Sequence, residues 1–145
     1  DYDKFKEEIL EAEQILIIAD NAGEAVFDKL LLRELAKYNL EITYAVREVP
    51  ILNDITKEEA VELGIGEWAN IISSGSKAPG MVMEQASEEF LEIYNKADII
   101  LSKGQGNLEG LSEVEKDIYY LLKAKCDLVA GLLEVEVGDF VFVQK

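Results

Sequence analysis

Four short polar clusters in this chain each follow a predicted hydrophobic strand. They comprise residues 20–24, Arg47, residues 73–76 and residues 103–107. In an open parallel sheet the carboxyl ends of the strands lie along one edge, which is where ligands bind. We therefore expect these clusters to converge, although they are far apart in the sequence. Their oxygen ligands, cations and glycine-rich turns together indicate a metal and phosphate site.

The first cluster offers a carboxylate and an amide oxygen side by side, on Asp20 and Asn21. Both are hard ligands that suit magnesium, manganese or a similar divalent ion. Gly23 permits a tight turn, and a helix that starts there directs its N–H groups and its positive end toward the same space. The alternative is that Asn21 merely caps this helix while Asp20 favours its positive end.

A second acid, Asp54, lies in the loop after the second predicted strand. Thr56 already matches the N-cap of a capping box, so Asp54 is not needed as a cap. Its apolar neighbours predict partial burial, and a buried carboxylate needs a partner. That partner is either Arg47 or a backbone amide, or else the cation held by Asp20 and Asn21.

The other two clusters carry features of anion binding. Residues 73–76 supply hydroxyls and amides ahead of a predicted helix, which suits an anion cradle but equally an ordinary turn. In the last cluster Gly104 and Gly106 allow close approach to a ligand, and Lys103 supplies a point charge for a phosphate oxygen. Neither a Walker P-loop nor a dinucleotide-binding fingerprint is present.

Composition narrows the possible partners and chemistry. The 145 residues carry a net charge of −16, from 30 acidic and 14 basic side chains. Such a field repels nucleic acids and anionic membranes, so neither is an expected partner. The chain has no histidine, which excludes histidine-based triads and the common zinc sites. The single cysteine, Cys126, excludes an internal disulfide and fits a reducing compartment, so we expect a cytoplasmic protein.

Strands alternate with helices along the chain, which predicts right-handed crossovers and a doubly wound, mostly parallel α/β sheet with helices on both faces. Residues 1–145 are expected to form one domain. In the predicted helix 24–38 the apolar residues Val26, Phe27, Leu30, Leu31 and Leu35 keep helical spacing. The predicted strands are 14–19, 41–46, 70–73, 97–101, 117–124 and an edge strand 140–143. The predicted helices are 1–13, 24–38, a short one from Thr56 to Gly64, 81–95, and a short helix or turn at 128–134.

Taken together, these motifs resemble those of the damage-control phosphatase family, metal-dependent phosphatases long grouped as a domain of unknown function. The resemblance covers most of the chain. It rests on residues 20–24 with Asp28, on Pro50 and residues 53–56, on residues 74–76, on residues 103–107, and on the pair Lys125-Cys126.

The resemblance implies a metal site at Asp20, Asn21 and Asp54, and a phosphate-binding Lys103 with Arg47 and the Ser74-Gly75 turn near the substrate. Family members hydrolyse phosphate esters of sugars or related metabolites, often with cobalt, nickel, manganese or magnesium. They also carry a helical amino-terminal region before the first motif. This chain is therefore expected to be a carboxy-terminal α/β fragment, against which that missing region packs.

The function expected from the sequence is metal-dependent hydrolysis of phosphate monoesters of sugars or related small metabolites. A metal-activated water attacks directly, and the substrate is a small phosphorylated metabolite. The alternatives are a non-catalytic module that binds phosphate or a small molecule and, ranked last, a carboxyl methyltransferase. The expected catalytic residues are Asp20, Asn21, Asp54 and Lys103. The expected substrate contacts are Arg47, Ser74, Gly75, Lys103, Gly104, Gly106, Asn107 and, more weakly, Glu24.

Overall fold

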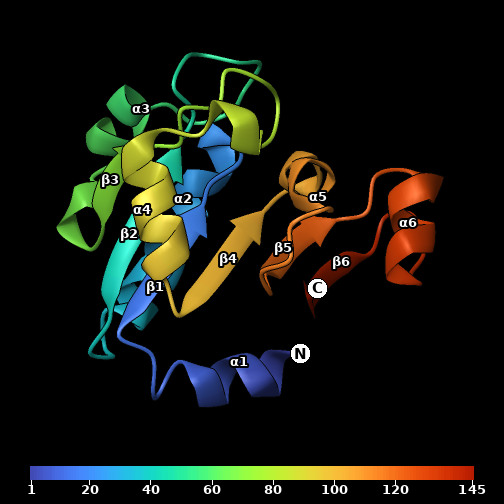
Figure 1. Ribbon diagram of the computed structural model, residues 1–145, viewed down its shortest axis with the longest axis horizontal. Coiled ribbons are helices and arrows are strands. Elements are labelled where there is room, and N and C mark those ends of the chain that lie inside the picture. The colour runs from blue at the N-terminus through green and yellow to red at the C-terminus, as the bar shows by residue number, and fades with distance from the viewer.

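The fold is built on one six-stranded sheet with the order β3-β2-β1-β4-β5-β6. The computed structural model describes residues 1–145, and Figure 1 shows the strands side by side, with the N-terminus at α1 below the sheet and the C-terminus at the end of β6. The first five strands are parallel, and β6 pairs antiparallel with β5. This confirms the predicted α/β class and the edge position of the last strand. The strands are β1 (Gln14–Ile18), β2 (Glu41–Val46), β3 (Asn70–Ser73), β4 (Ile99–Lys103), β5 (Tyr119–Lys123) and β6 (Phe140–Gln144).

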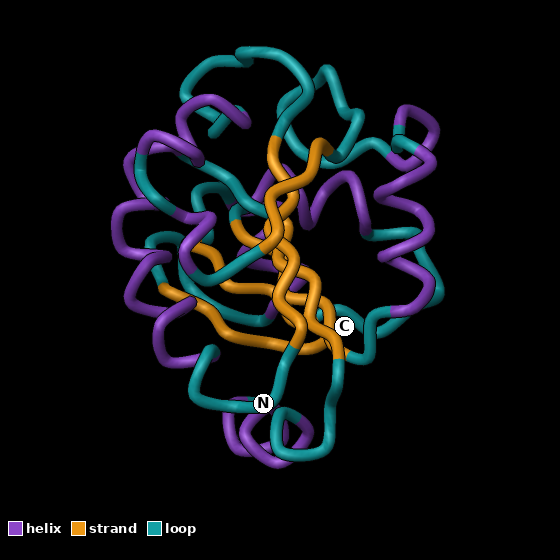
Figure 2. The backbone as a smooth tube through the Cα atoms, turned by 90° about the vertical axis from the view of Figure 1, so that its left-hand side faces the viewer, coloured by secondary structure: helices purple, strands orange, loops and turns teal.

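Helices cover both faces of the sheet, as Figure 2 shows in a view turned by 90°. One core joins α1, α2 and α3 to the sheet, and the other joins α4, α5 and α6. Strands β1 and β4 run between these cores and are buried on both faces, which explains the consecutive apolar residues 15–18 and 99–101 within them. The helices are α1 (Tyr2–Glu8), α2 (Ala22–Leu35), α3 (Lys57–Glu62), α4 (Glu88–Lys96), α5 (Gln105–Leu111) and α6 (Asp127–Leu133), with short 3-10 turns η1 (Ile65–Glu67) and η2 (Met83–Gln85). None of them combines the length and apolar character needed to cross a bilayer.

The capping box before α3 is present as predicted. The Thr56 backbone N–H donates to Glu59 Oε2 at 2.9 Å, and the Glu59 backbone N–H donates to Thr56 Oγ1 at 3.5 Å. After this helix Gly64 adopts a left-handed conformation with φ of 75°. The loop before the helix therefore ends at a defined point, and this leaves Asp54 free for another role.

Three helices differ from the sequence prediction. The helix expected over residues 1–13 ends at Glu8 and is followed by a turn at residues 9–11. The helix expected over residues 81–95 begins only at Glu88, because the Ser87 hydroxyl caps it by accepting a hydrogen bond from the Phe90 N–H at 3.1 Å. Met81 is nonetheless fully buried, so its apolar character reflects core packing outside a helix. Helix α5, within the glycine-rich segment after β4, was not predicted.

The apolar residues of α2 do not all face the core. Phe27 is 71% exposed, and Val26 and Leu30 are also exposed, whereas Leu32 and the acid Asp28 are buried. A charged side chain inside the helix face needs partners from other elements. Those partners lie in the candidate site.

Candidate functional site

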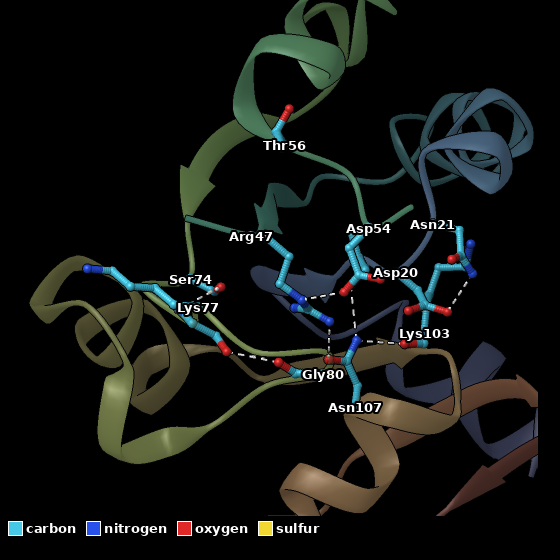
Figure 3. A network of polar contacts seen from close by, with 12 residues as sticks. Asp20, Asn21, Arg47, Asp54, Thr56, Ser74, Lys77, Gly80, Lys103 and Asn107 are labelled. Carbon is cyan, nitrogen blue, oxygen red and sulfur yellow. Dashed lines mark hydrogen bonds and ion pairs between the residues drawn. The ribbon is translucent and has the colours of Figure 1, made fainter. Parts of the chain in front are cut away.

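The loop after β2 is tied to the end of β1 by backbone hydrogen bonds. The Ile55 N–H donates to the Asp20 carbonyl at 2.8 Å, and the Ala22 N–H donates to the Asn53 carbonyl at 2.9 Å. Asn21 and Asp54 form an isolated antiparallel bridge between these segments. The structure thus brings Asp54 beside Asp20 and Asn21, as the strand-end argument expects (Figure 3).

Asn21 starts α2 without capping it through its side chain. Its Nδ2 donates instead to Asp20 Oδ2 at 2.8 Å and to Glu24 Oε1 at 3.3 Å. The simple capping alternative therefore does not describe this residue. The amide is turned toward the carboxylates, and its oxygen is not used by the helix.

Gly104 leaves room for the Asp20 carboxylate. A Cβ at this position would lie 2.0 Å from Asp20 Oδ2, and the backbone φ is 81°. Both conditions require glycine. The glycine expected to approach a ligand therefore lies against a candidate metal-binding carboxylate, which joins the end of β4 to the end of β1.

Arg47 is 1% exposed and binds within the chain. Its Nε donates to Asp54 Oδ2 at 2.7 Å, and its Nη2 donates to Asn107 Oδ1 at 2.7 Å (Figure 3). Of the partners left open for Asp54, Arg47 is thus present. Nη1 is buried without a partner. The guanidinium fixes Asp54, and its expected contact with phosphate stays a prediction.

Asn107 links three strand ends. It is fully buried, and its Nδ2 donates to the Ala19 carbonyl at 3.0 Å and the Lys103 carbonyl at 2.6 Å, while its oxygen accepts from Arg47. These bonds use both ends of the amide. Asn107 therefore holds β1, β2 and β4 in register at the site.

Lys103 is the last residue of β4 and is 5% exposed. Its Nζ donates to Asp28 Oδ1 at 2.5 Å and to Glu24 Oε2 at 3.1 Å. Tyr44 donates from its hydroxyl to Asp28 Oδ2 at 2.7 Å. Two carboxylates of α2 therefore hold the Lys103 ammonium at the site.

The serine loop after β3 satisfies its own polar groups. The Gly75 N–H donates to Ser73 Oγ at 3.1 Å and the Ser76 N–H to Ser74 Oγ at 3.3 Å, while Ser76 Oγ donates to the Gly80 carbonyl. A Cβ on Gly75 would lie 2.5 Å from the Gln85 carbonyl oxygen. Gly106 lies next to Gly80, and a Cβ added on Gly106 would lie 3.5 Å from the Gly80 Cα. Phosphate contacts at Ser74, Gly75 and Gly106 stay predictions.

A cavity of about 410 Å³ opens at this edge of the sheet. Asp20 and Lys103 line one part of it, and Phe27, Leu31 and Phe140 form an apolar wall. The volume exceeds what a phosphate group alone fills. The site therefore has room for the organic part of a small ester.

The charges of the site favour a cation. Burial is the main cause that raises the pKa of Asp20 from 3.8 to about 6, and the carboxylates of Asp54 and Glu24 raise it further. No cluster of three acid or thiol side chains surrounds one point, so a metal here would rely on two acids with the amide of Asn21. The hydrogen-bonded network holds more carboxylates than cations, with Asp20, Glu24, Asp28 and Asp54 against Arg47 and Lys103, and Lys125 lies near enough to lower the pKa of Asp20 slightly.

The family model of the Damage-control phosphatase ARMT1-like domain matches residues 1–141. The chain belongs to the damage-control phosphatase family. It is 44% identical over 137 residues to a damage-control phosphatase of Pyrococcus horikoshii, covering 93% of this chain and 48% of that protein. It is 36% identical over 143 residues to a damage-control phosphatase of Archaeoglobus fulgidus, covering 97% and 49%. The crystal structure of a DUF89 family protein from P. horikoshii matches with a TM-score of 0.95 and 42% identity, over 99% of this chain and 51% of that one.

The chain spans about half the length of the damage-control phosphatases that it matches. These matches do not bear out the narrower expectation that it is their carboxy-terminal part. They confirm the family resemblance and the α/β fold.

Two site residues of this family member received no role from the sequence, namely Asp28 and Tyr44. The family resemblance includes Asp28 but implies no role for it. The available signal is its spacing, because Asp28 follows Glu24 by four residues and so lies on the same side of α2. An acid in that position needs a cation from another element, and β4 supplies Lys103.

The raised pKa of Asp20 predicts how the stability of the metal-free protein depends on pH. Between pH 3.8 and about 6 the unfolded chain loses the Asp20 proton while the folded protein keeps it. The native state then binds more protons, so stability falls as pH rises through this interval. With solvent screening we expect a loss of about 1–2 kcal/mol. Urea unfolding from pH 4 to 8 will measure it, and Asp20→Asn should lack this component; equal pH curves for the two proteins would contradict it.

Proposed function

We propose that the protein to which this chain belongs is a metal-dependent phosphatase that hydrolyses phosphate monoesters of sugars or related small metabolites. The observation that carries the proposal is the meeting of Asp20, Asn21 and Asp54 at the end of β1, next to the segment that bears Lys103. Relatives named damage-control phosphatases support the same reaction class.

Asp20, Asn21 and Asp54 would hold a divalent metal, for which manganese, nickel, cobalt and magnesium are the candidates. Their two carboxylates and one amide are hard oxygen donors. Burial is the main cause that raises the pKa of Asp20, and the carboxylates of Asp54 and Glu24 raise it further, so a cation beside Asp20 would stabilise its charged form. When bound, the metal supplies Lewis-acid stabilisation of the phosphoryl group and a water of lowered pKa.

The residues of the chain supply binding and orientation. Lys103 offers its ammonium to a phosphoryl oxygen, since the dianionic phosphate needs a positive locus in an acidic protein. Arg47 holds one oxygen of Asp54 and so fixes the direction of the other. Gly104 has no Cβ and so leaves room for the Asp20 carboxylate beside it, and the cavity accepts the ester's organic part.

The proposed partners follow the same charges. The net charge of −16 disfavours nucleic acid and membrane surfaces, and a cytoplasmic location stays part of this proposal. We also propose that a further, helical region of the whole protein packs against this domain. The exposed apolar side chains of Phe27 and Phe140 and the greater length of the relatives support this contact.

A panel of sugar phosphates and an aryl phosphate, each assayed with manganese, nickel, cobalt or magnesium, tests the function. We expect turnover of at least one ester that stops on chelation and returns with added metal. Phosphate binding should weaken with the turnover. A module that only binds phosphate would keep its phosphate affinity in chelator and show no turnover, and this result would replace the phosphatase proposal.

A further inference from the structure

Three buried side chains form a connected line behind the candidate phosphate site. Tyr44 in β2 donates to Asp28 Oδ2 at 2.7 Å, and Lys103 in β4 donates to Asp28 Oδ1 at 2.5 Å. Their exposed fractions are 0% for Tyr44, 4% for Asp28 and 5% for Lys103. Asp28 is therefore held at both oxygens, from two strands that flank β1.

Burying this ion pair costs folding free energy. Two buried charges lose their hydration, and a well-packed apolar set of similar volume is often as stable or more stable. The pair therefore calls for a role other than stability. Burial and the Asp28 charge raise the pKa of the Tyr44 phenol far above its usual range, so the hydroxyl keeps its proton and acts as a donor to Asp28.

The contacts of Lys103 leave one donor for a ligand. An ammonium carries three N–H groups. Asp28 takes one, and the half-exposed Glu24 takes another at 3.1 Å. Lys103 lines the same cavity as Asp20, and Gly104 directly after it touches the Asp20 carboxylate. The ammonium is thus fixed at the border between the candidate metal ligands and the cavity.

We propose that Asp28, supported by Tyr44, is a positioning residue that fixes Lys103 so that its remaining N–H meets a phosphoryl oxygen of the substrate. The inference rests on the proposed phosphatase function. A free lysine samples many rotamers along its four-carbon stem, and ordering it beforehand lowers the entropy lost when phosphate binds. Asp28 touches neither the substrate nor the metal in this arrangement and acts through Lys103.

The test compares Asp28→Asn and Tyr44→Phe in the whole protein. Both keep the side-chain volume while weakening the line, and Glu92→Gln is the matched acid-to-amide control in an exposed pair with Lys96. The probes are an aryl phosphate for turnover and inorganic phosphate for binding, both with manganese. We expect Asp28→Asn to raise KM and the Kd of inorganic phosphate by about tenfold, the effect of one lost charge-assisted hydrogen bond. Tyr44→Phe should shift both in the same direction by about threefold.

The manganese concentration for half-maximal activity separates positioning from a merely structural role, and it should stay unchanged in both variants. Wild-type phosphate affinity in folded Asp28→Asn overturns the proposal, and so does a parallel loss of manganese and phosphate affinity. If Asp28→Asn does not fold, Tyr44→Phe decides by the same two constants. If the wild-type protein hydrolyses no ester, the proposed function fails, whereas the phosphate titration still decides whether Asp28 positions Lys103.

Discussion

Replacing Asp20 by asparagine should abolish metal-dependent phosphate-ester hydrolysis and at the same time stabilise the metal-free protein. The variant loses a proposed metal ligand, so we expect turnover to fall by at least about a hundredfold. It also loses the negative charge that burial and the neighbouring Asp54 disfavour. Its unfolding free energy at pH 8 should therefore rise by about 1–2 kcal/mol after allowance for partial solvent screening. Steady-state kinetics and urea unfolding measure the two effects.

Asp117→Asn is the matched control for this substitution. Asp117 is an exposed acid just before β5, at the opposite edge of the sheet from the site. It should change neither turnover nor stability beyond about 0.5 kcal/mol. Unchanged turnover in Asp20→Asn would defeat the assignment of the site, and a destabilised Asp20→Asn would show that the carboxylate contributes to the fold.

Replacing Arg47 by methionine should cost about 3–5 kcal/mol of unfolding free energy, because it leaves Asp54 charged and buried without a partner. Lys96→Met breaks the exposed pair with Glu92 and should cost less than about 1 kcal/mol. Chemical denaturation of the metal-free protein measures both.

Repeating Arg47→Met in an Asp54→Asn variant shows whether loss of the buried ion pair causes the destabilisation. In Asp54→Asn the acceptor for Arg47 is kept but the charge is gone, so Arg47→Met should cost clearly less there than in the wild type. Equal costs in the two backgrounds would mean that packing, and not the Asp54 charge, determines the effect.

Strand positions followed readily from the sequence. Residues 15–18 of β1 and 99–101 of β4 are all apolar because both faces of these strands are covered. The Thr56 capping box is a local signal that no distant contact alters. Helix α5 could not be found in this way. Its N-cap is Gly104 without a side-chain cap, and Gly106 and Gly110 lie inside it. An added Cβ on Gly110 would lie 1.9 Å from the Met81 carbonyl oxygen. Tertiary packing therefore requires glycine at this position, although glycine has a low helix propensity.

The position of the site was predictable from the sequence, but the ion pairs within it were not. Chain topology alone gathers the strand ends, which is why Asp20, Asn21 and Asp54 meet as expected. Which cation each acid contacts depends on side-chain directions across residues far apart in sequence, such as Lys103 and Asp28. The sequence offers Arg47 as a phosphate ligand, and the structure adds what the sequence could not, namely the contacts of its buried guanidinium with Asp54 and Asn107.

Calorimetric titration of the whole protein with manganese tests the central claim most directly. The account predicts one manganese ion per chain in the wild type and in Asp117→Asn, and no measurable binding in Asp20→Asn. Unchanged manganese affinity in Asp20→Asn would contradict the claim that the two acids and the Asn21 amide form the metal site.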